Sequence, residues 1–233
     1  MLLYRKIRYR KGYGVHSPFV YDFITKVVEE RSPYYCFHDI ELIRKRLFGD
    51  KTVAQVVRKK AIDPKRGALL FRTAHYFKAR NIVQIGSCMG LSTLYLTSYA
   101  AGLRCVSLES VPSYASISRW VYDEAARTPV DLRVGDCKAL LPDVLIDLAR
   151  LDLVYVHPLF EQHDMDWLFN ACLKHVHTGT ICIFDGIKAT GAMRRFWKTV
   201  CAHPDVTVTI DLYSMGIVFF DKKLHKRDYT VYF

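Results

Sequence analysis

Five short apolar runs follow one another through the middle of the chain, separated by segments with the character of amphipathic helices. We expect strands at NIVQIG, RCVSLE, VDLRVG, LDLVYVH and TICIFD, which begin near Asn81 and end near Asp185. Strands that are apolar throughout must be covered on both faces, which is typical of a mainly parallel sheet between layers of helices. The alternation therefore predicts an α/β fold.

The pattern changes near the end of the chain. The stretch VTVTIDLYSMGIVFF contains two apolar runs joined only by Ser214 to Gly216. A connection this short cannot make a parallel crossover, so the two runs must form a hairpin. We therefore expect the last strand to run antiparallel to the others.

The first third of the chain has helical rather than strand-like patterns. Ser17 can cap a helix whose first position is Pro18, and further helices are expected at Asp39 to Phe48 and Gly67 to Phe77. Residues 1–80 hold 19 Lys and Arg against 7 Asp and Glu, a net +12, whereas residues 81–233 hold 15 against 16, a net −1. We expect residues 1–66 to form a basic helical extension or lid and residues 67–233 to form the sheet domain.

Composition excludes several broad classes of protein. At 233 residues and 51% hydrophobic composition, the chain can bury one full core. No apolar run approaches the roughly eighteen residues that a membrane span needs, and MLLYRKIRYRK has too short an apolar segment for a secretory signal. The seven cysteines are widely spaced without a CxxC pair, which is typical of reduced core residues. We expect a cytoplasmic protein.

The stretch IVQIGSCMGLST places Gly86 at the end of the first expected strand and Gly90 at the start of the following helix. This junction is the usual ligand crevice of open α/β sheets. It is not GxGxxG, and it lacks the lysine of a phosphate-binding P-loop, which argues against kinase or nucleotide hydrolase chemistry. Two glycines let the backbone approach a bulky ligand. A plain structural turn is the alternative.

Two acidic residues follow at the ends of the next two strands. Glu109 ends RCVSLE, and its carboxylate can accept hydrogen bonds from both ribose hydroxyls of an adenosine. Asp136 follows VDLRVG and can accept from an adenine amino group, or it can cap the next helix. The glycine loop and the two carboxylates fall on successive strand ends. Together they predict a site for an adenosyl ligand.

The order of these features resembles the class I S-adenosylmethionine-dependent methyltransferases, in particular their O-methyltransferase-like branch. The resemblance rests on GSxxGxST, an acidic strand end, GD, an apolar strand into TICIFDGI and the final hairpin. GYGVHSPFVYDFI and IDLYSMGIVFF are similar to a bacterial subgroup of that branch. The resemblance implies a Rossmann-like three-layer fold with a seven-stranded, mainly parallel sheet and an antiparallel last strand.

The resemblance also implies S-adenosylmethionine as the cofactor. Its methionine portion would contact Gly86, Ser87 and Gly90, its ribose Glu109 and its adenine Asp136. The family's usual acidic residue two positions before the first glycine is here Gln84. An amide can still orient the loop, but it supplies no negative charge.

The candidate catalytic residues are His157 and Asp185. Metal-assisted members of the branch have an aspartate where this chain has His157, and an acidic-amide or paired acidic dipeptide where it has Asp185 and Gly186. Because hard cations prefer oxygen ligands, these departures argue against a divalent metal such as magnesium, and we assign no metal residues. A softer metal on His157, Asp185 and either His163 or Asp164 is an alternative.

His157 has two further interpretations. Its imidazole can take a proton from an acceptor hydroxyl during methyl transfer. It can equally be a strand-end histidine that is hydrogen-bonded to the backbone.

Three functions follow from these features. The first is O-methylation of a small or acidic acceptor, with Tyr13, His16 and Phe19 as a lid. The second is methylation of nucleic acid, which would bind basic and aromatic residues of the amino-terminal tail (Arg5, Lys6, Arg8, Arg10 and Lys11, with Tyr4, Tyr9 and Tyr13). The third is a catalytically decayed cofactor-binding protein, suggested by Gln84, His157 and Gly186. A homodimer is a further open alternative.

Overall fold

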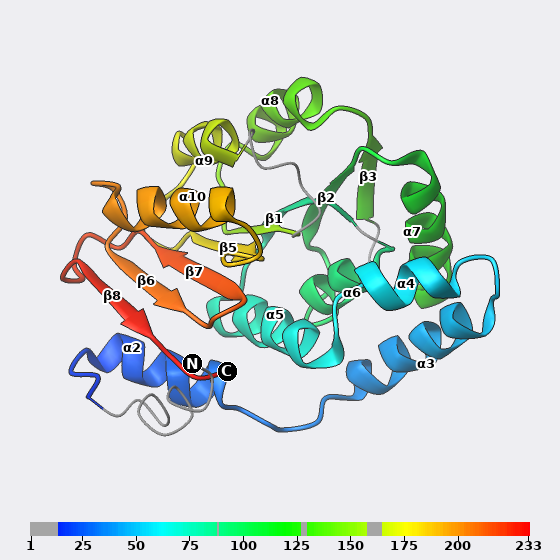
Figure 1. Cartoon of the computed structure of the whole chain (residues 1–233), viewed down its shortest axis with the longest axis horizontal. Helices are drawn as coiled ribbons and strands as arrows, with labels where there is room; N and C mark the ends of the chain where they lie inside the picture. Colours follow the sequence, from blue (N-terminus) through cyan, green and yellow to red (C-terminus); the bar gives the residue numbers. More distant parts are fainter. Residues whose placement is uncertain (1–13, 88, 127–129, 158–164) are drawn as a thin grey trace.

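A computed structural model describes residues 14–87, 89–126, 130–157 and 165–233. Within these residues, eight strands form one twisted sheet in the order β3-β2-β1-β4-β5-β7-β6-β8 (Figure 1). The strands are β1 (Asn81–Ile85), β2 (Arg104–Glu109), β3 (Val130–Val134), β4 (Leu153–Val156), β5 (Ile181–Asp185), β6 (Val208–Asp211), β7 (Met215–Phe219) and β8 (Arg227–Thr230).

Helices cover both faces of this sheet. The described helices are α2 (Pro18–Phe23), the π-helix η1 (Ile24–Val28), α3 (Tyr35–Gly49), α4 (Ala54–Lys60), α5 (Pro64–Phe77), α6 (Leu91–Thr97), α7 (Pro112–Ala125), α8 (Cys137–Leu148), α9 (Met165–Leu173) and α10 (Gly191–Ala202). One buried core lies between the sheet and α8, α9 and α10. The other lies between the sheet and the helices that precede it in sequence, with α6 and α7. The expected three-layer α/β architecture is therefore confirmed.

The directions of β1 to β7 agree with the prediction from the sequence, but the number of strands does not. β1 to β5 are parallel, and β6 and β7 form the predicted antiparallel hairpin. The prediction of seven strands is wrong, because β8 adds an eighth strand parallel to β6 at the edge of the sheet. Its residues, RDYT, are mostly polar and largely exposed, so they lack the apolar run by which the other strands were recognised.

The amino-terminal helices pack against α5. Ser17 caps α2 as predicted, because its Oγ accepts from the amide of Val20 at 3.4 Å. The helix then continues as the π-helix η1, where the amide of Glu29 donates to the carbonyl of Ile24, five residues earlier, at 2.9 Å. The carbonyl of Val27 accepts from Arg72 Nε of α5 at 2.7 Å.

Two expectations for this region have different outcomes. Phe19 stacks on Phe77 and Phe219, beside the start of β5, where Phe219 pairs with Ile181. It therefore lies at the amino edge of the parallel strands, and it does not cover the opposite edge as a lid would. The division of the chain at residue 66 stays a prediction, and α5 spans it.

The cysteines within the described residues behave as expected. Six are free thiols, and five of these are buried. None of the helices in the described part of the chain is both long and apolar enough to cross a bilayer.

At Gly67 of α5, the ring of Tyr95 of α6 fills the space that a side chain would need. A Cβ built on this glycine would lie 2.3 Å from the ring of Tyr95. That ring is fully buried, and its hydroxyl donates to Glu41 Oε1 at 2.8 Å, so it has little freedom to move. The position of α5, and of the side chains at its first turn, therefore depends on a residue without a side chain at position 67.

We predict that Gly67→Ala destabilises the fold by about 1–3 kcal/mol through overpacking, although alanine has the higher helix propensity. Urea unfolding measures this free energy. Gly49→Ala is the matched control, because nothing lies within 4 Å of the Cβ built at Gly49. Equal stability of the two variants would show that α6 retreats from α5 at little cost.

Candidate functional site

Four buried polar side chains lie at or near the carboxyl ends of adjacent parallel strands. They are Gln84 on β1, Glu109 on β2, His157 directly after β4 and Asp185 on β5, and each is at most 5% exposed. Parallel strands bring their carboxyl ends to one edge of a sheet, so residues that are distant in sequence become neighbours there. The sheet order β2-β1-β4-β5 makes this edge continuous.

The glycine loop after β1 has the backbone conformation that favours glycine. Gly86 has φ of 80° and Gly90 has φ of 74°. A Cβ on Gly86 would lie 3.2 Å from the Cβ of His157, and one on Gly90 would lie 2.9 Å from the ring of Tyr122 on α7. Gly86 thus allows the loop to pass close to β4, whereas Gly90 allows α7 to pack against α6.

The buried side chain of Gln84 fixes this loop by hydrogen bonds. Its Nε2 donates to the carbonyl of Gly86 at 2.9 Å and to Ser92 Oγ at 2.8 Å, while its Oε1 accepts from Thr93 Oγ1 at 2.9 Å. A carboxylate at this position could not donate to the Gly86 carbonyl. The amide is therefore matched to its surroundings, and it joins the loop to the first turn of α6.

Glu109 is fixed by groups on both sides. Ser87 Oγ donates to its Oε2 at 2.8 Å, and the amide of Val111 donates to its Oε1 at 3.0 Å. Ser87 Oγ also lies 2.9 Å from Ser118 Oγ of α7. Hydrogen bonds to an ionised carboxylate are among the stronger ones in proteins. The carboxylate is held rigidly beside the glycine loop.

A cavity of about 220 Å³ opens beside this carboxylate. Among the predicted cofactor contacts, Gly86 and Glu109 line the cavity, whereas Ser87, Gly90 and Asp136 are not among the lining residues. Asp136 is exposed and caps α8, accepting from the amide of Lys138 at 3.4 Å, although its neighbours do line the cavity. The lining residues are Lys60, Ile85, Gly86, Leu108, Glu109, Ser110, Val111, Tyr114, Gly135 and Cys137.

Asp185 forms an ion pair with Arg66, at the first turn of α5. Arg66 Nη1 lies 2.7 and 2.8 Å from the two carboxylate oxygens. The amide of Gly186 donates to the same carboxylate at 2.9 Å and the Tyr155 hydroxyl at 3.2 Å. Burial raises the pKa of Asp185, while the Arg66 guanidinium opposes this rise. Arg66 also bonds Asp63 through Nε at 2.6 Å, which fixes it between two acids.

His157 lies between this ion pair and the glycine loop. Its side chain is buried, and Nδ1 has no hydrogen-bond partner among the described residues. Burial, with the positive charges of Arg66 and Lys60, lowers the pKa of His157 to about 3. The ring is therefore neutral at physiological pH and is a weak proton acceptor, because efficient general bases have a pKa near the working pH.

This arrangement does not fit a magnesium ion. A cation on Asp185 would have to displace the Arg66 guanidinium, and Gly186 offers no side-chain ligand. Within the described ranges, no group of three or more His, Cys, Asp or Glu could hold a metal ion. His163 and Asp164, proposed as ligands for a softer metal, lie outside the described residues.

The sequence did not point to Arg66, Lys60 or Tyr155. Arg66 and Asp185 are 119 positions apart, and nothing in the pattern pairs an arginine on the first turn of one helix with a later strand end. The alternation of side chains along β4 does place Tyr155 on the same face as residue 157. That signal could have identified Tyr155 as a neighbour of the site.

Comparison with known proteins agrees with this geometry. Residues 83–187 match a family model described as a methyltransferase domain. The chain is 24% identical over 180 residues to the catechol O-methyltransferase of Niastella koreensis, covering 69% of this chain and 79% of that one.

Solved structures of methyltransferases have a similar fold. An O-methyltransferase from Bacillus cereus, in complex with SAH, superposes with a TM-score of 0.63 at 20% identity, covering 86% of this chain and 97% of that one. A SAH-bound methyltransferase from Podospora anserina gives 0.65 at 16%, covering 88% and 96%. The chain therefore has the fold of these methyltransferases. Its residues 83–187 are similar in sequence to a methyltransferase domain, and the curated relative it matches is an O-methyltransferase.

We predict that His157 makes the stability of the protein depend on pH. The unfolded histidine titrates near 6.5, but the folded one titrates near 3, so the unfolded state binds the proton first as the pH falls. The full contribution is present above pH 6.5 and is lost progressively towards pH 3, by up to about 1.4 kcal/mol per pH unit. Urea unfolding between pH 7.5 and 4.5 should show a shallower slope for His157→Gln than for the wild type. His38→Gln, at an exposed histidine, is the matched control, and equal slopes for His157→Gln and the wild type would contradict the prediction.

We predict that Arg66→Met destabilises the protein by roughly 2–4 kcal/mol, because it leaves the buried carboxylate of Asp185 without its counter-ion. The double variant Arg66→Met, Asp185→Asn should recover at least half of that loss, since the amide carries no charge. Urea unfolding at neutral pH measures both variants. If the losses measured for Arg66→Met and for Asp185→Asn alone add up in the double variant, the ion pair does not dominate the energetics of this part of the site.

Proposed function

We propose that this protein is an S-adenosylmethionine-dependent methyltransferase that methylates oxygen on a small or acidic acceptor. The observation that carries the proposal is the rigid Glu109 carboxylate beside Gly86, at the mouth of a cavity formed by adjacent strand ends. In the solved relatives, the Bacillus cereus and Podospora anserina enzymes are described as bound to SAH. We expect a ligand of this kind to bind to this chain at the strand ends around Gly86 and Glu109.

The residues around the cavity suit an adenosyl group. Glu109 lines the cavity, and a carboxylate can accept several hydrogen bonds, so its oxygens suit the hydroxyls of a ribose. Ile85, Leu108 and Val111 supply apolar walls. The volume of about 220 Å³ is below the roughly 300–1,000 Å³ of most ligand pockets, so a ligand of this kind would extend past the rim.

S-adenosylmethionine, when bound, supplies a methyl group on a positively charged sulfur, so the main requirement on the protein is alignment of the acceptor. Transfer would break the carbon–sulfur bond of the donor as a carbon–oxygen bond forms, and the acceptor hydroxyl would release its proton to solvent water. The neutral ring of His157 orients the acceptor by a hydrogen bond rather than taking its proton. Its low pKa argues against a role as the general base, and Nδ1 is the ring atom without a partner among the described residues.

Arg66 supplies positive charge at the place where metal-assisted relatives use a cation. Its side chain is 25% exposed, so the ion pair with Asp185 does not enclose it completely. Fixed positive charge aimed at a developing oxyanion lowers the barrier for its formation. In this proposal Asp185 positions Arg66, and Arg66 stabilises the acceptor oxygen.

The alternative function on nucleic acid stays a prediction. The basic tail on which it rests lies outside the described residues.

We predict that S-adenosylhomocysteine raises the melting temperature of the wild-type protein, because a ligand selective for the folded state stabilises it. Glu109→Gln should weaken its affinity about tenfold, or about 1.4 kcal/mol, through loss of the charged ribose acceptor. Asp143→Asn, which changes an exposed carboxylate on α8, is the matched control. The proposal fails if neither S-adenosylhomocysteine nor S-adenosylmethionine shifts the melting temperature of the wild type.

Turnover separates an enzyme from a decayed binding protein. Transfer of the methyl group to any catechol or hydroxybenzoate acceptor in a panel would exclude the non-catalytic alternative. Binding without transfer to any of them would favour it.

A further inference from the structure

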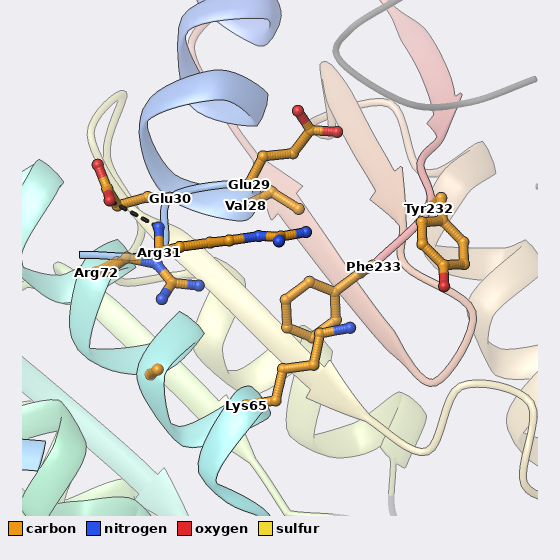
Figure 2. Close-up of a pocket in the computed structure, with 9 residues that line it drawn as sticks. Val28, Glu29, Glu30, Arg31, Lys65, Arg72, Tyr232 and Phe233 are labelled. Atoms are coloured by element: carbon orange, nitrogen blue, oxygen red, sulfur yellow. Dashed lines mark hydrogen bonds between the residues drawn. The ribbon is translucent and has the colours of Figure 1, made fainter. Parts of the chain in front are cut away.

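A second and larger cavity lies beside the first half of α5. It has a volume of about 570 Å³ and is bounded by the end of η1, by α5 and by the segment that follows β8 (Figure 2). Its lining residues are Val28, Glu29, Glu30, Arg31, Lys65, Ala68, Arg72, Tyr232 and Phe233. This volume is within the range of small-molecule sites.

Three cationic side chains reach this cavity, and none forms an ion pair with a carboxylate of the described residues. Arg72 is 7% exposed and uses Nε to donate to the carbonyl of Val27 at 2.7 Å. Lys65 Nζ lies 4.2 Å from the centre of the Phe233 ring and 6.0 Å from that of Tyr232. Figure 2 shows Arg31 extending across the cavity between Glu29 and Arg72.

The charge of Glu30 partly offsets that of Arg72, but no ion pair joins Glu30 to any of the three cations. Glu30 Oε1 accepts from the backbone amides of Arg31 and Ser32 at 2.7 and 2.6 Å, which ties its carboxylate to the turn after η1. Burial lowers the pKa of Lys65, and the charges of Arg31 and Arg72 lower it further, while Asp63 opposes them. An anion in the cavity would relieve this repulsion.

The cavity opens at the same edge of the sheet as the glycine loop. β8 runs parallel to β6, and both are antiparallel to β7, which in turn is antiparallel to β5. Tyr232 and Phe233 therefore follow a strand end on the carboxyl edge. On α5, Lys65 faces this cavity while the next residue, Arg66, binds Asp185 at the end of β5.

We propose that this cavity binds the anionic part of the methyl acceptor, so that the acceptor is a small molecule carrying a carboxylate or phosphate on an apolar body. The proposal rests on the methyltransferase function proposed above. Arg31 and Lys65 hold the anion, with Arg72 as a fixed charge behind them. Val28, Ala68 and Phe233 contact the apolar body, and the acceptor hydroxyl extends towards Arg66.

Calorimetry with a matched pair of probes tests this proposal. Protocatechuate carries a catechol ring and one carboxylate, whereas its amide has the same shape without the charge. We expect the full-length protein to bind the acid about tenfold more tightly than the amide, the size of one charge-assisted contact. Phenyl phosphate, compared with phenol, tests the phosphate in the same way.

Two substitutions locate the binding. Lys65→Met should weaken the acid about tenfold and leave the amide unchanged, and Ala68→Leu should weaken both by filling the cavity. Lys45→Met, at an exposed lysine on α3, is the matched control. Circular dichroism and unfolding curves check that each variant is folded.

The outcomes are distinct from those of the cofactor experiment. The proposal is overturned if neither anion binds more tightly than its neutral partner. It is also overturned if Lys65→Met leaves the binding of the anion unchanged. A different result is that S-adenosylhomocysteine raises the melting temperature while the probes show no preference for charge. That result would support the methyltransferase function and exclude this class of acceptor. In turnover assays, the charge preference should lie in KM rather than in kcat, because the anion is remote from the oxygen that reacts.

Discussion

The ion pair between Arg66 and Asp185 connects the helical region that precedes the sheet in sequence to the sheet itself. It joins the first turn of α5 to the end of β5, and Tyr155 and Gly186 complete the coordination of the carboxylate. The same guanidinium contributes to the neutral state of His157. A fixed organic cation thus binds the carboxylate that a metal ion would need at this strand end. The departures from the metal-binding pattern form one consistent arrangement, and they do not require that the site has decayed.

Gln84 supports the same interpretation. The family that the sequence resembles usually has an acidic residue at this position, yet the amide donates to the Gly86 carbonyl and accepts from Thr93 in a fully buried position. Both ends of the amide are used, which is the condition under which a buried polar group stabilises a fold rather than destabilising it. The glycine loop therefore keeps its shape without a charge beneath it. What the loop loses is attraction for a positively charged ligand, and Glu109 is the nearby carboxylate that remains.

The sequence predicted the parallel strands and the hairpin because both depend on local apolar periodicity. It also predicted that Gly86 and Glu109 would converge, since parallel strands bring their carboxyl ends together. It could not predict the partner of Asp185, because that pairing depends on how α5 packs against the sheet, which Gly67 and Tyr95 decide. β8 was missed because an exposed edge strand needs no apolar run. The cofactor contacts of Gly86, Ser87, Gly90, Glu109 and Asp136 all stay predictions.

The wide turn of η1 has a consequence for how such a protein can change. A π-turn in a helix is equivalent to one additional residue, and it is often found at functional positions. Deleting one residue between Ile24 and Val28 would restore regular α-helical winding, and the following segment would rotate by about 100°. Arg31 would then leave the wall of the larger cavity while the sheet stayed intact. A single codon gained or lost there would change the lining of the proposed acceptor cavity without changing the sheet.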